Sequence, residues 1–351
     1  MTPAPLAVSL GEPAGVGPEI IAKAWLALKG TGPAFVVVGD AASLEAWTPP
    51  GSVRRIGDAA EATALFKNFL PVLDVPLEGP IAPGAPSAAG AAFVVRWIET
   101  AARLALSGEA SGLVTGPIAK APLYEAGFSF PGHTEFLGAL CAGSLQEEPR
   151  APKGPVMMLV AGDLRVALVT IHEPLARVPG LLTGDLIVNA GLVTARALKN
   201  DFGIARPRLA VAGLNPHAGE AGALGREEIE VIAPATARLR AEGVDAAGPA
   251  PADSLFHPEA RAQFDAALCM YHDQGLIPVK MVDFWGGVNV TLGLPLVRTS
   301  PDHGVAFDIA GKGLARDGSL LAALRLAGEI AHRRFSSPFE EGRPRSGGGG
   351  G

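Results

Sequence analysis

Three of the seven histidines in this 351-residue chain each follow an apolar segment with the pattern of a buried β-strand. The segments end in Thr170-Ile171-His172, Asn215-Pro216-His217 and Met270-Tyr271-His272. One such histidine is more often structural than a ligand, but three at equivalent strand ends favour a shared site. Neutral imidazole binds zinc and related divalent ions, and three ligands leave one coordination position open for substrate. The spacing is too long for a local metal motif, so composition alone leaves both interpretations open.

The densest group of ionisable residues, 272–280, follows the third of these strands, which we predict at 266–270. Strand ends of α/β proteins open into the crevice that holds ligands, so this position is typical of a functional site. Gly275 and Pro278 predict that the chain turns here. The alternative is a surface loop with ordinary polar residues.

Other polar residues could join the same site. Asp253 and Asp273 could orient the histidine rings or act as acid–base groups. Lys280, Asn289 and Arg298 lie among apolar residues, and buried cations are costly unless an anion is present. They therefore indicate an anionic ligand, unless they reach solvent at strand ends.

Two turns in the first half of the chain could bind anions. The glycine-rich segment 11–20 lies between a predicted strand and a helix, a layout that can cradle phosphate. Its glycines match no known phosphate-binding fingerprint, and a tight structural turn is equally compatible. His133 and Thr134 precede a predicted helix at 135–141, where they could bind an anion or Thr134 could cap the helix.

Strands and helices alternate along the chain, which predicts a largely parallel sheet covered on both faces. The length suggests two domains, and a hairpin of 156–160 with 164–171 suggests that the second sheet is mixed. The other predicted strands are 6–10, 34–39, 111–115, 208–214 and 266–270, and the main helices are 18–28, 90–106, 135–141, 185–199, 227–242 and 318–335.

Composition excludes several classes of protein. The net charge is −6 and no Lys/Arg-rich run exists, which argues against nucleic-acid binding. No apolar run approaches the roughly 20 residues that span a bilayer, and no signal peptide is evident. Two cysteines make a disulfide framework improbable, so we expect a cytoplasmic protein. Residues 336–351 end in five glycines and are predicted to be disordered.

Several long motifs resemble the 4-hydroxythreonine-4-phosphate dehydrogenase family, in order over about residues 5–330. The motifs are Leu10-Gly11-Glu12-Pro13-Ala14-Gly15-Val16-Gly17-Pro18-Glu19-Ile20, Thr115-Gly116-Pro117, Pro131-Gly132-His133-Thr134-Glu135-Phe136, Leu214-Asn215-Pro216-His217-Ala218-Gly219-Glu220, Tyr271-His272-Asp273-Gln274-Gly275, and the segments 286–295 and 298–311. The resemblance implies the two-domain isocitrate/isopropylmalate dehydrogenase-like α/β fold, with the active site in the interdomain cleft and NAD bound without a Rossmann fingerprint. We expect 1–130 plus 285–335 to form the first domain and 131–284 the second, with the metal ligands and the dimer contact.

The resemblance also implies residue roles. His172, His217 and His272 would hold one divalent ion (Zn, Mg, Co or Mn), with one ligand supplied by the partner chain of a homodimer. Substrate contacts fall on His133, Thr134, Lys280, Asn289 and Arg298. The cofactor loop, 303–313, would bind NAD or NADP through His303, Gly304, Ala306 and Asp308. Lys280 and Asp253 are the candidates for the general base. Glu12, where relatives usually have Asp, and Ala119, where a polar residue is common, depart from the pattern.

The implied reaction is oxidation of 4-phosphooxy-L-threonine at C3 to 2-amino-3-oxo-4-phosphooxybutanoate. This β-keto acid would lose CO₂ to give 3-amino-2-oxopropyl phosphate, a precursor of pyridoxine 5′-phosphate. The nearest alternative is a sister dehydrogenase that acts on a phosphorylated four-carbon sugar acid or a dihydrodiol carboxylate. More distant alternatives are a metal-dependent phosphate-ester hydrolase and a non-catalytic binding protein.

Overall fold

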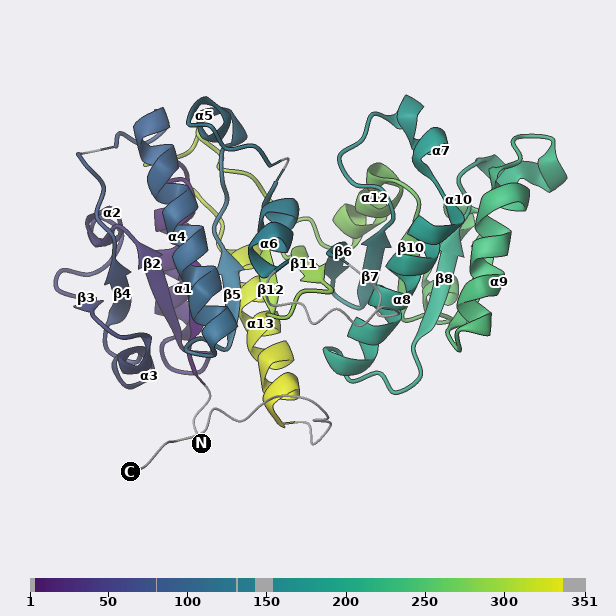
Figure 1. Ribbon diagram of the computed structural model, residues 1–351. Coiled ribbons are helices and arrows are strands. Elements are labelled where there is room, and N and C mark those ends of the chain that lie inside the picture. Colours follow the sequence, from purple (N-terminus) through teal and green to yellow (C-terminus); the bar gives the residue numbers. More distant parts are fainter. Residues whose placement is uncertain (1–3, 80, 131, 143–153, 337–351) are drawn as a thin grey trace.

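The computed structural model describes residues 4–79, 81–130, 132–142 and 154–336 (Figure 1). Apart from Ser336, the tail predicted at 336–351 lies outside these residues. One sheet runs through the described chain, with the strand order β3 (Val53–Ile56), β4 (Leu70–Asp74), β2 (Phe35–Gly39), β1 (Leu6–Ser9), β5 (Gly112–Thr115), β12 (Arg298–Pro301), β11 (Val288–Leu292), β6 (Val156–Ala161), β7 (Leu164–Leu168), β10 (Ala266–Cys269), β8 (Arg208–Ala212) and β9 (Asp245–Ala250).

The sheet has two parallel parts joined by antiparallel strands. From β3 to β12 every neighbouring pair is parallel, as are the pairs among β7, β10, β8 and β9. Between them, β11 pairs antiparallel with β12 and β6, and β6 pairs antiparallel with β7. The predicted α/β class is confirmed, and the predicted hairpin is the β6–β7 pair. The domain boundaries near 130 and 285 stay a prediction.

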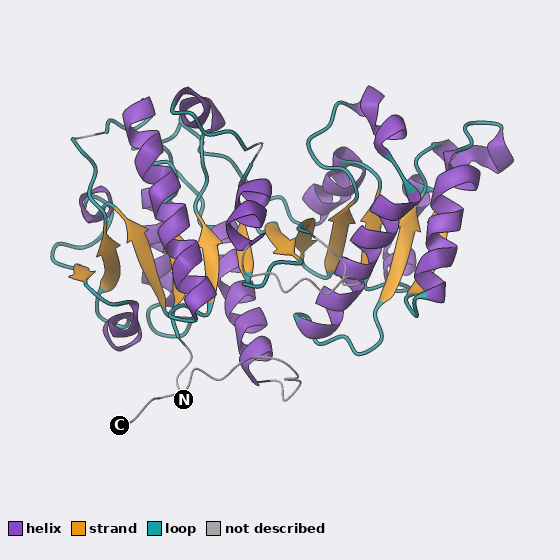
Figure 2. Ribbon diagram, in the orientation of Figure 1, coloured by secondary structure: helices purple, strands orange, loops and turns teal. Residues whose placement is uncertain are grey.

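Helices lie on both faces of the sheet (Figure 2). Two of the long helices begin at side-chain caps: Ser87 Oγ accepts from Gly90 N at 3.2 Å at the start of α4, and Thr183 Oγ1 accepts from Leu186 N at 3.2 Å at the start of α8. The longer helices are α1 (Gly17–Leu28), α4 (Ala88–Ser107), α6 (His133–Cys141), α8 (Gly184–Asn200), α9 (Ala233–Ala241), α12 (His272–Val282) and α13 (Gly318–Ser336); the shorter ones are α2 (Ala41–Glu45), α3 (Ala62–Leu65), α5 (Lys120–Glu125), α7 (Val178–Leu181), α10 (Ala252–Leu255) and α11 (Pro258–Arg261).

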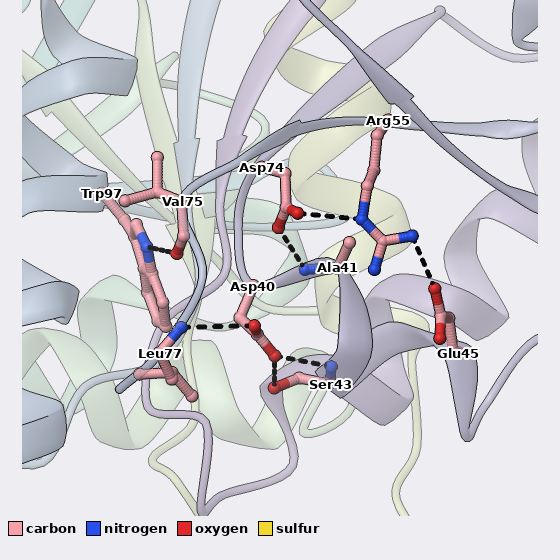
Figure 3. Close-up of polar contacts among 9 residues, drawn as sticks. All are labelled: Asp40, Ala41, Ser43, Glu45, Arg55, Asp74, Val75, Leu77 and Trp97. Carbon is pink, nitrogen blue, oxygen red and sulfur yellow. Dashed lines mark hydrogen bonds and ion pairs between the residues drawn. The ribbon is translucent and has the colours of Figure 1, made fainter. Parts of the chain in front are cut away.

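Two aspartates close the loops after β2 and β4 (Figure 3). The Asp40 carboxylate accepts from Ser43 N at 2.7 Å and from Ser43 Oγ at 2.6 Å, which caps α2. Asp74 accepts from Ala41 N at 2.9 Å and forms an ion pair with Arg55 at 2.8 Å. Because both carboxylates already have protein partners, we assign them a structural role and not a role in ligand binding.

The turn predicted at Gly275 and Pro278 is wrong, because both residues lie inside α12. A Cβ atom on Gly275 would lie 2.5 Å from Val166 Cγ1 and 2.8 Å from Leu168 Cδ2. Glycine is therefore needed for close packing of α12 on β7, and it does not break the helix.

The helix predicted at 227–242 is present as one π turn, Glu228–Ile232, that continues into α9.

The glycine-rich turn at 11–17 is a tight structural turn. Glu12 N donates to Pro117 O at 2.8 Å, Ala14 N to Glu12 Oε1 at 3.1 Å and Val16 N to Val305 O at 3.0 Å. Because these N–H groups already have protein acceptors, the turn does not present them to a phosphate. Its contact with Val305 instead supports the segment 303–313.

In the part of the chain that the structure describes, no single helix is long and apolar enough to cross a membrane. One pair, Leu175–Leu181 and Gly184–Asn200, meets that test only when counted together across a 94° bend.

Candidate active site

A cavity of about 340 Å³ lies between the two parallel parts of the sheet. One wall comes from the ends of β5 and β12 and from α6, and the other from β6, the loop after β7 and the start of α12. The cavity brings together eight of the predicted site residues: His133, Thr134, His172, His272, Asn289, Arg298, His303 and Gly304.

Arg298 is the principal positive group of the cavity. It begins β12, is 2% exposed, and donates to Thr115 Oγ1 at 2.7 Å and Thr291 Oγ1 at 2.9 Å. Its Nε atom has no partner among the described residues. Burial lowers the pKa of the guanidinium to about 10, although the charge of Glu135 opposes this shift. A buried cation bound only to hydroxyl groups leaves room for an anionic ligand.

Two further polar atoms of the cavity lack protein partners in the described chain. They are Nε2 of His133 and Oδ1 of Asn289, both buried. Burial, with the charges of Arg298 and Lys120, lowers the pKa of His133 well below its usual value, so its ring is neutral. Buried polar atoms are normally hydrogen-bonded, so these atoms fit a polar ligand that supplies the partners.

Thr134 lies at the second position of α6 and is buried in the cavity wall. The N-cap position belongs to Gly132, and no side chain caps this helix. The interpretation of Thr134 as a cap is therefore wrong.

His172 and His272 face each other, with their ring centroids 5.5 Å apart. They meet because β7 and β10 are adjacent, and Thr170 continues the pairing with hydrogen bonds from its N and Oγ1 to Met270 O at 3.2 and 2.7 Å. Asp273 Oδ1 lies 2.7 Å from His272 Nδ1. When Nδ1 donates to this carboxylate, Nε2 is left free as a metal ligand.

His217 follows β8, the other neighbour of β10, but it does not line the cavity. Within the described ranges no three His, Cys, Asp or Glu residues converge on a metal position. Burial, with the charges of Lys120 and His272, lowers the pKa of His172. A neutral His172 ring and a carboxylate-oriented His272 are chemically suited to a divalent ion. The structure brings together two of the three predicted ligands, and His217 does not line the cavity with them.

Lys280 and Asp253 both lie outside the cavity wall. Lys280 Nζ is 2.7 Å from Asp302 Oδ2 and donates to Asp302 O at 2.9 Å, and Asp302 itself lines the cavity. Asp253 is exposed on α10, which packs against the segment Pro216–Gly222 that contains His217. Lys280 is thus adjacent to the cavity, whereas Asp253 lies on a helix that packs against the segment of one histidine.

The segment 303–313 borders the cavity only at its first residues, His303 and Gly304. A Cβ atom on Gly304 would meet nothing within 4 Å, so the backbone here faces open space that a cofactor could occupy. Ala306 has a positive φ of 46°, and neither it nor Asp308 lines the cavity.

The sequence analysis assigns no role in the site to several polar residues of the cavity wall, among them Thr115, Lys120, Glu135 and Asp302. Thr115 and Lys120 are the first and last residues of Thr115-Gly116-Pro117-Ile118-Ala119-Lys120. In this segment a predicted strand end is followed by a cation, a pattern that indicates a ligand site. Glu135 and Asp302 sit beside predicted residues, but only the fold indicates that they face the cavity.

The model of the family described as "Pyridoxal phosphate biosynthetic protein PdxA" matches residues 32–327. This match covers most of the chain. The chain belongs to this family. The resemblance noted from the motifs is therefore confirmed.

Individual relatives agree with the family assignment. The chain is 65% identical over 334 residues to the 4-hydroxythreonine-4-phosphate dehydrogenase of Caulobacter vibrioides, covering 95% of this chain and 99% of the relative. The crystal structure of the enzyme of that name from Klebsiella pneumoniae matches with a TM-score of 0.82 at 40% identity, covering 94% and 98% of the two chains. The terephthalate 1,2-cis-dihydrodiol dehydrogenase of Burkholderia xenovorans matches with a TM-score of 0.62 at 29% identity, covering 93% and 98%.

Proposed function

We propose that this protein is a 4-hydroxythreonine-4-phosphate dehydrogenase that acts in pyridoxine 5′-phosphate biosynthesis. It oxidises 4-phosphooxy-L-threonine at C3 with NAD⁺ or NADP⁺, and the 2-amino-3-oxo-4-phosphooxybutanoate formed decarboxylates to 3-amino-2-oxopropyl phosphate. The observation that carries this proposal is the buried Arg298, whose charge lacks a carboxylate partner among the described residues, in a chain whose relatives bear this name.

The unpaired atoms of the cavity match the groups of this substrate. Arg298 is positioned for one of its anionic groups, and the neutral His133 can donate to or accept from a second group through Nε2. Asn289 Oδ1 is an acceptor, suited to the substrate's ammonium or hydroxyl group. Thr134, in the same wall, adds a hydroxyl group at the start of α6.

Lys280 is our candidate for the group that takes the hydroxyl proton. Lys280 would accept this proton as the neutral amine, and Asp302, whose Oδ2 lies 2.7 Å from Nζ beside the cavity, would stabilise the ammonium formed. Asp253 is the weaker candidate because it is exposed and does not line the cavity, and its helix α10 packs against the His217 segment.

A divalent ion (zinc, magnesium, cobalt or manganese) would be held by His172, His217 and His272. The nicotinamide would lie beside the segment that contains His303, Gly304, Ala306 and Asp308. When bound, the ion would supply a Lewis acid that lowers the pKa of the substrate hydroxyl, and NAD⁺ or NADP⁺ would supply the hydride acceptor.

We further propose a homodimer in which the partner chain completes the histidine site. Exposed apolar side chains cluster on α12 and the turn after it, next to Lys280: Ile277 is 64% exposed, Met281 82%, Phe284 58% and Trp285 53%. Such a patch is typical of a protein–protein interface. A cytoplasmic location is proposed with it, since Cys141 and Cys269 are free thiols.

The deciding experiment measures reduction of NAD⁺ and NADP⁺ with a substrate panel. The panel contains 4-phosphooxy-L-threonine, a phosphorylated four-carbon sugar acid and a dihydrodiol carboxylate. We expect the first to give the highest kcat/KM and EDTA to abolish the activity. The dihydrodiol is the second candidate because of the solved dehydrogenase of that type at 29% identity. Higher kcat/KM with it would overturn the substrate assignment, and full activity after EDTA would remove the metal from the mechanism.

A further inference from the structure

A buried carboxylate anchors the loop that carries His217. Glu228 is 3% exposed, and its Oε1 accepts from Leu214 N and Asn215 N, both at 2.7 Å. Its Oε2 accepts from Asn215 Nδ2 at 2.9 Å. The carboxylate therefore binds three N–H donors of the segment that leads directly to His217.

The loop so held has an unusual backbone. His217, Ala218, Gly219, Glu220 and Ala221 have φ angles of 54°, 51°, 79°, 43° and 54°, a run in the left-handed region. This region costs roughly 1–2 kcal/mol for each residue other than glycine, so the run persists only where surrounding contacts fix it. A Cβ atom on Gly219 would lie 2.6 Å from Glu228 Oε2, so the loop closes tightly over the carboxylate.

Gln274 connects this loop to the one that carries His272. Its side chain is 7% exposed; Oε1 accepts from Met270 N at 2.7 Å and Nε2 donates to Gly213 O at 2.6 Å. Met270 lies two residues before His272, and Gly213 is adjacent to Leu214. One continuous set of buried hydrogen bonds thus joins the ends of β10 and β8 to Glu228.

We propose that Glu228 and Gln274 are positioning residues that fix the loops of His217 and His272 and thereby set the affinity for a divalent ion. This inference rests on the metal site of the proposed function. Neither residue lines the cavity, so both act through the histidines and not on the substrate. Groups that orient metal ligands typically contribute 10–100-fold to metal affinity, which sets the size of the expected effect.

The test measures Co²⁺ binding by calorimetry to full-length protein stripped of metal by a chelator. Glu228→Gln keeps the volume but places an amide NH₂ where the carboxylate accepted, and Gln274→Met removes both hydrogen bonds at similar length. We expect the Kd for Co²⁺ to rise about 10- to 100-fold in each variant. The matched control is Glu230→Gln. It removes an exposed carboxylate of the same π turn, which forms an ion pair with Arg226. The Kd of this variant for Co²⁺ should equal that of the unchanged protein.

The melting temperature of each metal-free variant separates positioning from simple stabilisation. A purely structural role lowers this temperature and leaves the Kd of the folded protein unchanged. Folded Glu228→Gln and Gln274→Met with wild-type Kd would therefore overturn the inference, and Gln274→Met alone decides if Glu228→Gln does not fold. Absence of Co²⁺ binding in the unchanged protein would overturn both the metal site and this inference. Equal Co²⁺ binding by the unchanged protein and all variants would overturn this inference alone.

Discussion

The two sides of the cavity differ in whether their buried polar groups have hydrogen-bond partners within the protein. On the side built by β12, α6 and β11, the buried atoms Arg298 Nε, His133 Nε2 and Asn289 Oδ1 have no partner among the described residues. Behind the histidine side, outside the cavity wall, Glu228 accepts from backbone and side-chain N–H groups, and Gln274 accepts from Met270 N and donates to Gly213 O. Unpaired buried atoms carry a free-energy cost that a ligand can remove, whereas paired ones fix geometry. The first side is thus suited to binding a ligand, and the second to fixing the loops that carry the histidines.

Lys280 links the two sides, since it comes from α12 and contacts Asp302 after β12. Lys280→Met should lower kcat about 10²- to 10⁴-fold, the usual contribution of a general acid–base group. Steady-state kinetics with 4-phosphooxy-L-threonine measures this. Asp302→Asn should give a smaller decrease, because the amine remains but loses its charged partner.

Lys67→Met is the matched control, since Lys67 is an exposed lysine remote from the cavity wall, and its kcat should not change. An unchanged kcat in Lys280→Met would transfer the role of base to another residue and remove the proposed link between the two sides.

Arg298→Met tests the binding side directly. Removing the buried cationic partner of a desolvated anion costs about 3–4 kcal/mol, so kcat/KM should fall roughly 10²- to 10³-fold. The free energy of unfolding without ligand should fall much less, because the buried cation lacks a charged partner in the described chain. Kinetics and urea unfolding are measured on the same variant, with Arg55→Met, a half-exposed arginine of β3, as the control.

An equal loss of stability and of catalytic efficiency in Arg298→Met would assign the arginine to the core. The contrast between the two sides would then fail at its strongest point.

Much of the histidine side was predictable from the sequence, and its assembly was not. Apolar runs before His172, His217 and His272 predict β7, β8 and β10, because buried parallel strands read as continuous apolar segments. The order β7-β10-β8 depends on pairing between residues distant in the chain, which no local pattern encodes. The same limit applies to Asp302, whose place in the cavity depends on the pairing of β12 with β5.

The local sequence misleads about the secondary structure of two segments. The strand Arg298–Pro301 has no apolar pattern, so it was not predicted, although its arginine was singled out. Gly275 and Pro278 are typical of turns, yet packing of α12 on β7 outweighs that preference.

Gly275→Ala tests how rigid the histidine side is. The added methyl group would overlap Val166 and Leu168, and overpacking of this kind costs about 1–3 kcal/mol of unfolding free energy. Urea unfolding measures the change, and Gly30→Ala, whose Cβ would meet nothing within 4 Å, is the control. No loss of stability in Gly275→Ala would mean that α12 can shift on β7, against the rigid placement inferred for this side.

The smallest expected effect is a pH dependence of stability that arises on the binding side. Burial and the nearby Arg298 and Lys120 charges lower the pKa of His133, so the unfolded chain binds a proton at a pH where the folded chain does not. Stability from this group is complete above the unfolded pKa of about 6.5 and falls as the pH decreases, by up to about 1.4 kcal/mol per pH unit. His133→Asn should remove this part of the slope in urea unfolding between pH 7 and pH 5. An identical slope in the variant would mean that His133 titrates normally, and that its Nε2 is not buried without a partner on the side of the cavity made to bind.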